Sequence, residues 1–165
     1  MKYSENMKAE LFALLGIGLF LVVLALQQAQ PLFSAEIPNQ GFVVVSVSVN
    51  NSDMALEGDC RRLSMTVSDH QALSIASALD GKYYIRPLTH DIMNDIFDNY
   101  GIELVAAHID AFTDGVYTAK IYINKDSKML EVDARPTDAV GLALRMGVPV
   151  YFNKELLDIN GEKTC

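Results

Sequence analysis

The chain has 165 residues, half of them hydrophobic, and a formal net charge of −8. This length allows one ordinary domain with an appendage, and the hydrophobic share is enough for a packed core. Proteins that bind nucleic acid through its phosphates usually carry basic surfaces, so the acidic balance leaves only a local basic groove, or a metal that bridges carboxylates to phosphate. The two cysteines have neither CxxC nor Cys/His spacing, which argues against a zinc site.

The N-terminal region contains an unbroken apolar run, LFALLGIGLFLVVLAL, over residues 11–26. The run predicts a membrane segment over residues 9–28. A cleaved signal peptide is the main alternative, and a buried core helix is the third. Residues 1–29 are therefore assigned to an anchor or signal segment, and residues 30–41, with two prolines and little charge, to a linker.

Charge places the domain relative to the membrane. Lys2 and Lys8 precede the apolar run, and no further Lys or Arg occurs before Arg61. The N-terminus is thus expected inside and the domain outside the cytoplasm, as a single-pass membrane protein or, after cleavage, as a secreted one. A disulfide between Cys60 and Cys165 is chemically possible in that compartment, with two reduced thiols as the alternative.

The first half of the domain reads as two strands and two helices. Alternating valines predict a strand over 42–49, followed by a polar turn over 50–61 and a second strand over 62–67. An S-x-x-Q capping box at Ser68 opens a helix that ends at Gly81. A second apolar stripe at helical spacing ends at Gly101, with Thr89 as its expected N-cap.

The second half reads as a set of strands and one helix. The pattern predicts strands over 103–109, 117–123 and 129–133, with a turn of the Asp-Gly type over 110–115. A third helix ends at Gly147, a short strand follows over 148–152, and the charged tail from residue 153 is expected to fray. We set the domain at residues 42–158 and the tail at residues 159–165.

The predicted order, β-β-α-α-β-β-β-α-β, indicates an α+β fold with a mixed or antiparallel sheet and three helices. A strand, a cap, a helix of small residues and a terminal glycine occur twice, over 62–81 and 129–147. This succession predicts a pseudo-repeat of strand-strand-helix units, preceded by the N-terminal hydrophobic helix.

Two polar motifs mark the junctions between strands and helices. RPLTHD spans residues 86–91, and a partial echo, DARPTD, spans residues 133–138. With their flanking helices and the Asp-Gly hairpin between them, these motifs resemble the bifunctional nuclease domain family over about residues 42–158. The resemblance implies a compact α+β domain, commonly oligomeric, with nuclease activity on RNA and DNA, but no settled set of catalytic residues.

Phosphodiester hydrolysis needs a nucleophile, a stabilised phosphorane charge and a proton for the leaving oxygen, and the motifs contain suitable groups. An imidazole can transfer protons near neutral pH, and guanidinium groups can bind phosphate in a bidentate way. The candidate catalytic residues are Arg86, His90, Asp91, Arg135 and Asp138. The candidate ligands for a divalent metal, Mg²⁺ or Mn²⁺, are Asp110, Glu131 and Asp133.

The same residues have structural interpretations. Asp91 and Asp138 are first-turn acids of helices, Asp110 flanks a turn, and the two arginines could each pair with a carboxylate of the opposite junction. The leading hypothesis is a nuclease that acts on RNA or DNA outside the cytoplasm, with nucleic acid and the membrane as partners and a homo-oligomer as its expected state. The alternatives are a non-catalytic oligomeric binding or assembly domain and an extracytoplasmic sensor of a small ligand or peptide.

Overall fold

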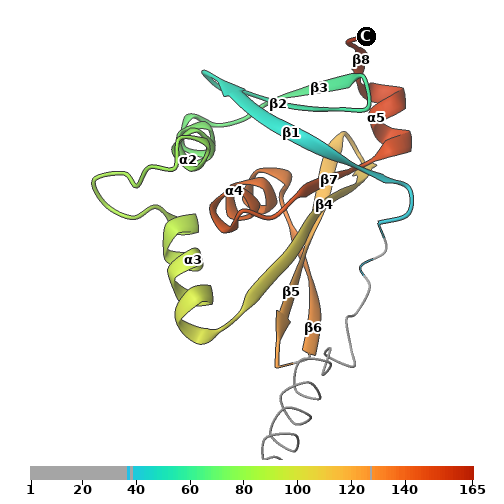
Figure 1. Ribbon diagram of the computed structural model, residues 1–165. Coiled ribbons are helices and arrows are strands. Elements are labelled where there is room, and N and C mark those ends of the chain that lie inside the picture. The colour runs from blue at the N-terminus through green and yellow to red at the C-terminus, as the bar shows by residue number, and fades with distance from the viewer. Residues whose placement is uncertain (1–36, 38, 127) are drawn as a thin grey trace, which may run out of the picture. The chain divides into compact units, whose positions relative to one another are not determined.

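The computed structural model describes residue 37 and residues 39–126 and 128–165 (Figure 1). The predicted membrane segment over residues 9–28 lies outside these residues. Within them, none of the helices has the length and apolar character that crossing a bilayer requires.

Eight strands form one sheet in the order β6-β5-β4-β7-β1-β2-β3-β8. Their bounds are β1 Phe42–Asn50, β2 Asp53–Gly58, β3 Arg61–Thr66, β4 Glu103–Thr113, β5 Val116–Lys125, β6 Lys128–Ala134, β7 Val150–Asn153 and β8 Glu162–Lys163. Only the β4–β7 pair is parallel among the described strands, so the predicted mixed sheet is confirmed.

Four helices accompany this sheet in the described part of the chain, where the sequence predicted three. They are α2 Asp69–Leu79, α3 Thr89–Tyr100, α4 Pro136–Met146 and α5 Lys154–Asn160. The chain runs twice through three consecutive antiparallel strands and then a helix, as β1-β2-β3-α2 and as β4-β5-β6-α4. The two segments that predicted a repeat, 62–81 and 129–147, correspond to β3 with α2 and β6 with α4.

The helix α4 lies at the centre of the fold, against α2, α3 and the strands β4 and β5 (Figure 1). Its small residues Ala139, Gly141 and Ala143 are buried, which lets neighbouring backbones approach closely. Large side chains from the sheet and from α2 complete the core, among them Met54, Leu56, Ile75, Ile109 and Phe152. Burial of these side chains provides most of the stabilisation that holds α2 and α4 on the sheet.

The strand β2 replaces the polar turn that the sequence predicted over 50–61. Met54, Ala55 and Leu56 are all buried, because β2 lies between β1 and β3 and has cover on both faces. A strand covered on both faces shows no alternation of apolar and polar residues, and three apolar residues between polar neighbours gave no period-two signal.

The C-terminal tail is ordered, so the expectation that it frays is wrong. Asn153 caps α5 by accepting a hydrogen bond from the Leu156 N–H at 3.2 Å. Beyond α5, β8 pairs with β3, and a disulfide joins Cys60 to Cys165. The tail was predicted from its charge alone, and the pairing partners that order it lie about a hundred residues earlier in the chain.

Helix caps were predicted well at α2 and less well at α3. The Ser68–Gln71 capping box is confirmed, with the Ser68 N–H donating to Gln71 Oε1 at 3.0 Å. At α3 the N-cap is Leu88, one residue before Thr89, and its N–H donates to Asp91 Oδ2 at 2.7 Å. The predicted turn over 110–115 is also shorter, because β4 continues to Thr113 through a bulge near Asp110.

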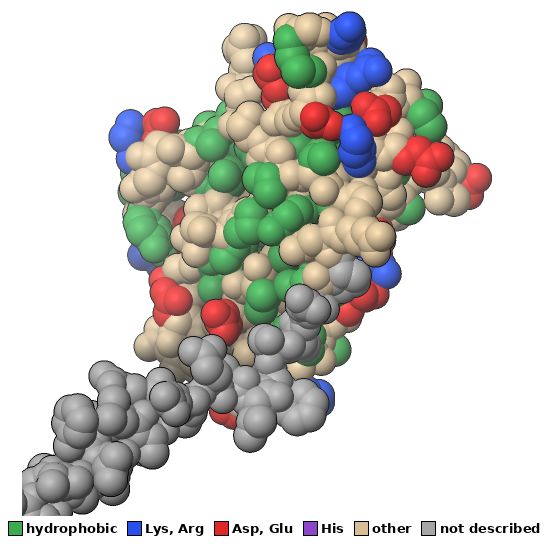
Figure 2. Space-filling model, turned by 45° about the vertical axis from the view of Figure 1, so that its right-hand side comes forward, with side chains coloured by type: hydrophobic (Ala, Val, Ile, Leu, Met, Phe, Trp, Pro, Cys, Tyr) green, Lys and Arg blue, Asp and Glu red, His purple; other side chains and the backbone are tan. Residues whose placement is uncertain are grey.

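Charged side chains of both signs meet where β3, α5 and β8 come together, at the top of Figure 2. Arg61 lies 3.5 Å from Asp158, and Lys154 pairs with both Asp158 and Asp59. Arg61 and Lys154 at this end thus each have an acidic partner. On the face that Figure 2 shows, acidic side chains lie among and below the basic ones, which form no stripe along the face.

Candidate functional site

A cavity of about 490 Å³ lies where α2, the first turn of α3, α4 and the end of β6 meet. Apolar side chains form much of its wall, including Leu73, Met93, Ile121, Val132 and Leu142. Polar residues line the remainder, namely His70, Gln71, Ser74, Thr89, His90, Asp133, Arg135 and Asp138. The cavity therefore brings together the two polar junctions that are 40 and more residues apart in the sequence.

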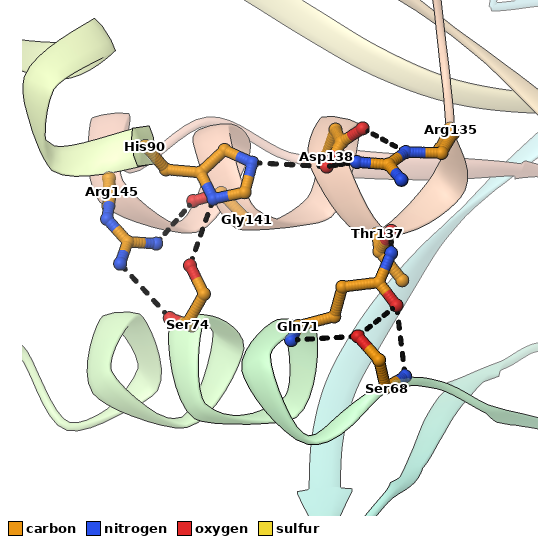
Figure 3. A network of polar contacts seen from close by, with 9 residues as sticks. All are labelled: Ser68, Gln71, Ser74, His90, Arg135, Thr137, Asp138, Gly141 and Arg145. Carbon is orange, nitrogen blue, oxygen red and sulfur yellow. Dashed lines mark hydrogen bonds and ion pairs between the residues drawn. The ribbon is translucent and has the colours of Figure 1, made fainter. Parts of the chain in front are cut away.

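The central polar group of this cavity is the imidazole of His90, a residue that is 9% exposed. Its Nδ1 lies 2.9 Å from Ser74 Oγ on α2, and its Nε2 lies 3.5 Å from Asp138 Oδ1 on α4 (Figure 3). His90 therefore connects all three helices around the cavity through its two ring nitrogens.

These neighbours determine which ring nitrogen of His90 carries the proton. A carboxylate only accepts hydrogen bonds, so the proton is assigned to Nε2, which faces Asp138. Nδ1 then presents its lone pair and accepts a hydrogen bond from the Ser74 hydroxyl. The basic atom of His90 is therefore directed at Ser74.

Burial lowers the pKa of His90 from its usual value near 6.5, and the positive charge of Arg145 lowers the pKa further. The negative charge of Asp138 and its hydrogen bond raise the pKa by less. The imidazole is consequently neutral at neutral pH, which is the form that can take up a proton during catalysis.

The glycine of α4 at position 141 makes space for this imidazole. A Cβ at Gly141 would lie 3.1 Å from both Cε1 and Nδ1 of His90, closer than ordinary van der Waals contact. The ring therefore lies directly on the α4 backbone, and any larger residue at this position would displace it.

Arg135 and Asp138 form a bidentate ion pair at the start of α4. Arg135 Nε donates to Oδ2 at 2.6 Å, and Nη2 donates to Oδ1 at 3.0 Å. The suggested pairing of Arg135 with the opposite junction is therefore wrong, since its partner is three residues along its own helix. The Arg135 side chain is 71% exposed beside the cavity, where a guanidinium can contact a phosphate.

A second polar link fastens α2 to the start of α4. Gln71 Nε2 donates to Thr137 Oγ1 at 2.9 Å, while Gln71 Oε1 accepts from the Ser68 hydroxyl at 2.9 Å (Figure 3). The capping box of α2 thereby also fixes the distance between two helices that line the cavity.

Asp91 faces away from the cavity and is 2% exposed. Its Oδ1 accepts a hydrogen bond from Arg145 Nε at 2.5 Å, in an ion pair buried on both sides. Burial opposes the ionisation of Asp91, but the hydrogen bonds from Arg145 and the Leu88 N–H outweigh it and lower the pKa of the carboxyl. Arg145 also donates to the carbonyl oxygens of Gly141 and Ser74, so this ion pair joins α3, α4 and α2.

The sequence that forms these strands and helices matches a known family. The model of the bifunctional nuclease domain matches residues 54–164, which is more than half of the chain. The chain belongs to the bifunctional nuclease domain family.

Several known proteins are similar in sequence to this chain. An uncharacterized protein of Mycobacterium tuberculosis is 34% identical over 97 residues, which cover 59% of this chain and 57% of the relative. Bifunctional nuclease 2 of Arabidopsis thaliana is 26% identical over 102 residues, and bifunctional nuclease 1 of the same plant is 24% identical over 102 residues. These matches cover 60% of this chain and 31% of each plant protein, so the chain spans only part of the length of its relatives.

Not every candidate residue of this bifunctional nuclease domain belongs to the cavity. The structure brings together His90, Arg135 and Asp138, and it places Asp91 behind them. Arg86 is exposed in the segment between α2 and α3 and lies outside the set of residues that line the cavity. The expectation that both arginines pair across the junctions therefore fails for Arg135, and the ion pairs of the described residues include none with Arg86.

The three residues suggested as metal ligands have a basic neighbour. Lys120 Nζ lies 2.6 Å from Glu131 and 3.7 Å from Asp110, so its ammonium group already occupies the position between the two carboxylates. Asp133 is opposite Lys120 in the β5–β6 register and borders the cavity. In the described part of the chain, no three His, Cys, Asp or Glu side chains come together as metal ligands, so these donors do not fit a ready metal site.

Sequence reasoning missed Ser74 and Arg145. Ser74 lies among the small residues of α2, in the stretch AL-S-IA, and nothing in that pattern sets it apart from packing. Arg145 gave a signal that could have been used, because it is the single charged residue in LALRMG, the otherwise apolar C-terminal part of the helix. A lone charge at such a position usually has a buried partner.

Proposed function

We propose that this bifunctional nuclease domain hydrolyses phosphodiester bonds of RNA or DNA in the cavity between α2, α3 and α4. The observation that supports the proposal is the convergence of His90, Asp138 and Arg135 on one cavity from two distant junctions. The names of the Arabidopsis relatives, bifunctional nucleases 1 and 2, support phosphodiester bonds as the substrate.

Each of the three residues has a distinct role in this proposal. Neutral His90 takes up a proton in the first step of cleavage, and the Asp138 carboxylate stabilises the imidazolium that results. Arg135 contacts the phosphate, in part exchanging its bond to Asp138 for bonds to the phosphate oxygens. The apolar wall can hold a base or sugar next to the scissile bond.

The test is cleavage of fluorescent single-stranded RNA and DNA by the purified full-length protein, kept in solution with a mild detergent. His90→Ala should lower the cleavage rate by about 100-fold or more, as expected for loss of a general base. Arg135→Ala should mainly raise KM, while Arg62→Ala, which removes an exposed arginine of β3 distant from the cavity, should change neither parameter. Full activity of His90→Ala would overturn the assignment of the site.

Dependence on Mg²⁺ or Mn²⁺ is a separate part of the proposal. Because Lys120 already pairs with Glu131 and Asp110, no step is assigned to a metal at these residues. Cleavage measured across a titration with EDTA, then with added Mg²⁺ or Mn²⁺, tests the dependence directly. Unchanged cleavage in excess EDTA would remove the metal from the proposal.

We also propose that the domain acts outside the cytoplasm, attached to a membrane through residues 9–28 or released by cleavage. The Cys60–Cys165 disulfide supports this location, since disulfides persist in oxidising compartments. Fractionation of producing cells, combined with alkylation by a thiol reagent that cannot cross membranes, checks it. Recovery in the soluble cytoplasmic fraction with both thiols free would contradict it.

A non-catalytic assembly domain is the second candidate, favoured by the apolar outer face of α3. Ile92, Ile96 and Tyr100 follow one another at four-residue spacing and are 50%, 46% and 68% exposed. A homo-oligomer that buries this stripe should dissociate in Ile96→Asp and persist in Asp95→Asn, an exposed neighbour on the same helix. Light scattering gives the mass, and an oligomer that never cleaves nucleic acid would favour this candidate over the nuclease.

A further inference from the structure

We propose that Ser74 is the nucleophile of this site, and that Ser74, His90 and Asp138 form a serine–histidine–aspartate relay. The relay rests on the proposed function only for its substrate, the phosphodiester, and its geometry is independent of nucleic acid. It places the attacking oxygen on α2, in a part of the chain outside both polar motifs.

The hydroxyl of Ser74 has an unusual partner for a serine in a helix. Helical serines commonly donate back to the carbonyl four residues earlier, and Ser77 on the same helix does so, donating to the Leu73 carbonyl oxygen at 2.8 Å. Ser74 Oγ is bonded instead to His90 Nδ1 at 2.9 Å. Its hydroxyl proton is therefore already directed at a base.

The tautomer of His90 allows the imidazole to accept the hydroxyl proton of Ser74. Since Nε2–H faces the Asp138 carboxylate, the one basic lone pair of the imidazole is at Nδ1, and the group in contact with it is the Ser74 hydroxyl. Asp138 occupies the third position of the relay, where a carboxylate stabilises the imidazolium. The 3.5 Å separation of Nε2 from Oδ1 is loose, as such contacts often are without substrate.

Two further contacts hold the serine in position. Arg145 Nη2 donates to the Ser74 carbonyl oxygen at 3.1 Å, which fixes this turn of α2 against α4. Gly141 allows the imidazole to lie close to α4 and so within reach of Ser74. Ser74 is only 6% exposed, and it belongs to the cavity lining, so the residue lies at the wall of the cavity that a bound substrate would contact.

The chemical step conserves atoms and charge. Ser74 Oγ forms a bond to phosphorus while the bond from phosphorus to the leaving oxygen breaks. The hydroxyl proton passes to His90 Nδ1 and then to the leaving oxygen. Water next hydrolyses the Oγ–P bond, with His90 taking the proton of the water and returning it to Oγ, which restores serine and releases a phosphate monoester.

A small organophosphorus fluoride, diisopropyl fluorophosphate, tests the relay without nucleic acid. Reaction forms an Oγ–P bond and expels fluoride, while the hydroxyl proton leaves through His90. The full-length protein should gain one diisopropylphosphoryl group, located at Ser74 by peptide mass spectrometry. His90→Ala should slow this reaction by about 100-fold and Asp138→Asn to a smaller extent, whereas Ser77→Ala should react as the unchanged protein does.

The outcomes separate the relay from the proposed function. No adduct, or an adduct on another residue, overturns the relay. Cleavage of RNA or DNA by Ser74→Ala at the unchanged rate also overturns it, and leaves the nuclease proposal standing if His90→Ala is inactive. Labelling of Ser74 in a protein that cleaves neither RNA nor DNA would support the relay and reject the nuclease.

Discussion

His90 and Asp91 are consecutive residues of α3 with opposite surroundings. The first turn of the helix directs His90 into the cavity and Asp91 toward Arg145, where both partners of the ion pair are buried. One residue of the motif is therefore available for chemistry, while its neighbour holds three helices together. The roles separate because successive side chains on a helix point in different directions.

The neutral form of His90 sets the pH dependence that we predict. Because burial and Arg145 lower the pKa of His90, the base form persists below pH 6.5, and kcat/KM should stay level from about pH 8 down to that value. Activity should then fall as the pH drops through the lowered pKa. Cleavage rates measured across this range check it, and an acid limb above pH 6.5 would contradict the buried, neutral imidazole.

Breaking the buried ion pair should be costly. Asp91→Ala leaves the Arg145 guanidinium without its partner and should lower the free energy of unfolding by about 3–5 kcal/mol. The double change Asp91→Ala with Arg145→Met should recover much of the loss, because no buried charge remains. Urea denaturation monitored by circular dichroism gives both values.

The exposed ion pair of the site is the matched control for that experiment. Arg135→Met should cost about 0–1 kcal/mol, because Arg135 is largely solvated. Equal costs for Asp91→Ala and Arg135→Met would show that burial does not distinguish the two pairs.

The buried ion pair also makes stability depend on pH. The pKa of Asp91 is lowered in the folded state, so its contribution to stability is present above pH 3.8 and is lost as the pH falls through the lowered value.

At the scale of elements, α4 is the helix against which the other two helices of the site, α2 and α3, pack. Asp138, Gly141 and Arg145 recur every three or four residues and lie against His90 of α3 or Ser74 of α2, while Arg135 lies at the start of the helix (Figure 3). The remaining sides of α4 carry the small and aliphatic residues of the core. The same helix therefore packs at the centre of the fold and carries residues of the candidate site.

Gly141→Ala should separate activity from stability. Alanine is preferred over glycine inside a helix by about 0.5–1 kcal/mol, which offsets the crowding of the His90 ring at 3.1 Å. We expect an unfolding midpoint close to that of the unchanged protein. The reaction of Ser74 with diisopropyl fluorophosphate should be slowed at least tenfold. Unchanged reactivity of Ser74 with a normal unfolding midpoint would mean that the position of the His90 imidazole against α4 does not matter for the reaction.

The same elements show what could be predicted from the sequence. Period and capping signals gave β1, β3, α2 and α3, because each of these elements has exposed residues along one face and a local end signal. The helix α4 has no exposed residue, and it was predicted from the helical spacing of its apolar residues and from Gly147 at its end. The strand β2 was missed since it is covered on both faces, and α5 with β8 was missed because distant pairing orders them. In the site, the polar junctions gave His90, Arg135 and Asp138. Ser74 lies among small residues, and its contact with His90 arises only because α2 and α3 both pack on α4.

At the scale of the whole molecule, the disulfide closes the sheet at one end. Cys60 precedes β3 and Cys165 follows β8, at a sequence separation of 105 residues. Cys60→Ser with Cys165→Ser should lower the free energy of unfolding by about 2–5 kcal/mol. Denaturation with and without a reductant measures the loss.

The disulfide should not affect the chemistry of the site. Residues of β3, α5 and β8 are absent from the cavity lining, so the rate per folded molecule should be the same in the disulfide-free variant. A reduced rate in molecules that remain fully folded would indicate a connection between this end of the sheet and the cavity.

The position of β7 has a consequence for the order in which the protein is assembled. β7 lies between β4 and β1, and these two strands meet only through it. During synthesis both three-strand units and all three helices of the cavity emerge before β7, yet the two halves of the sheet stay unjoined until Val150–Asn153 has been added. A chain stalled before that point would expose the unpaired edges of β1 and β4 that β7 covers in the complete sheet. The eight-stranded sheet can therefore form only after β7 has been synthesised.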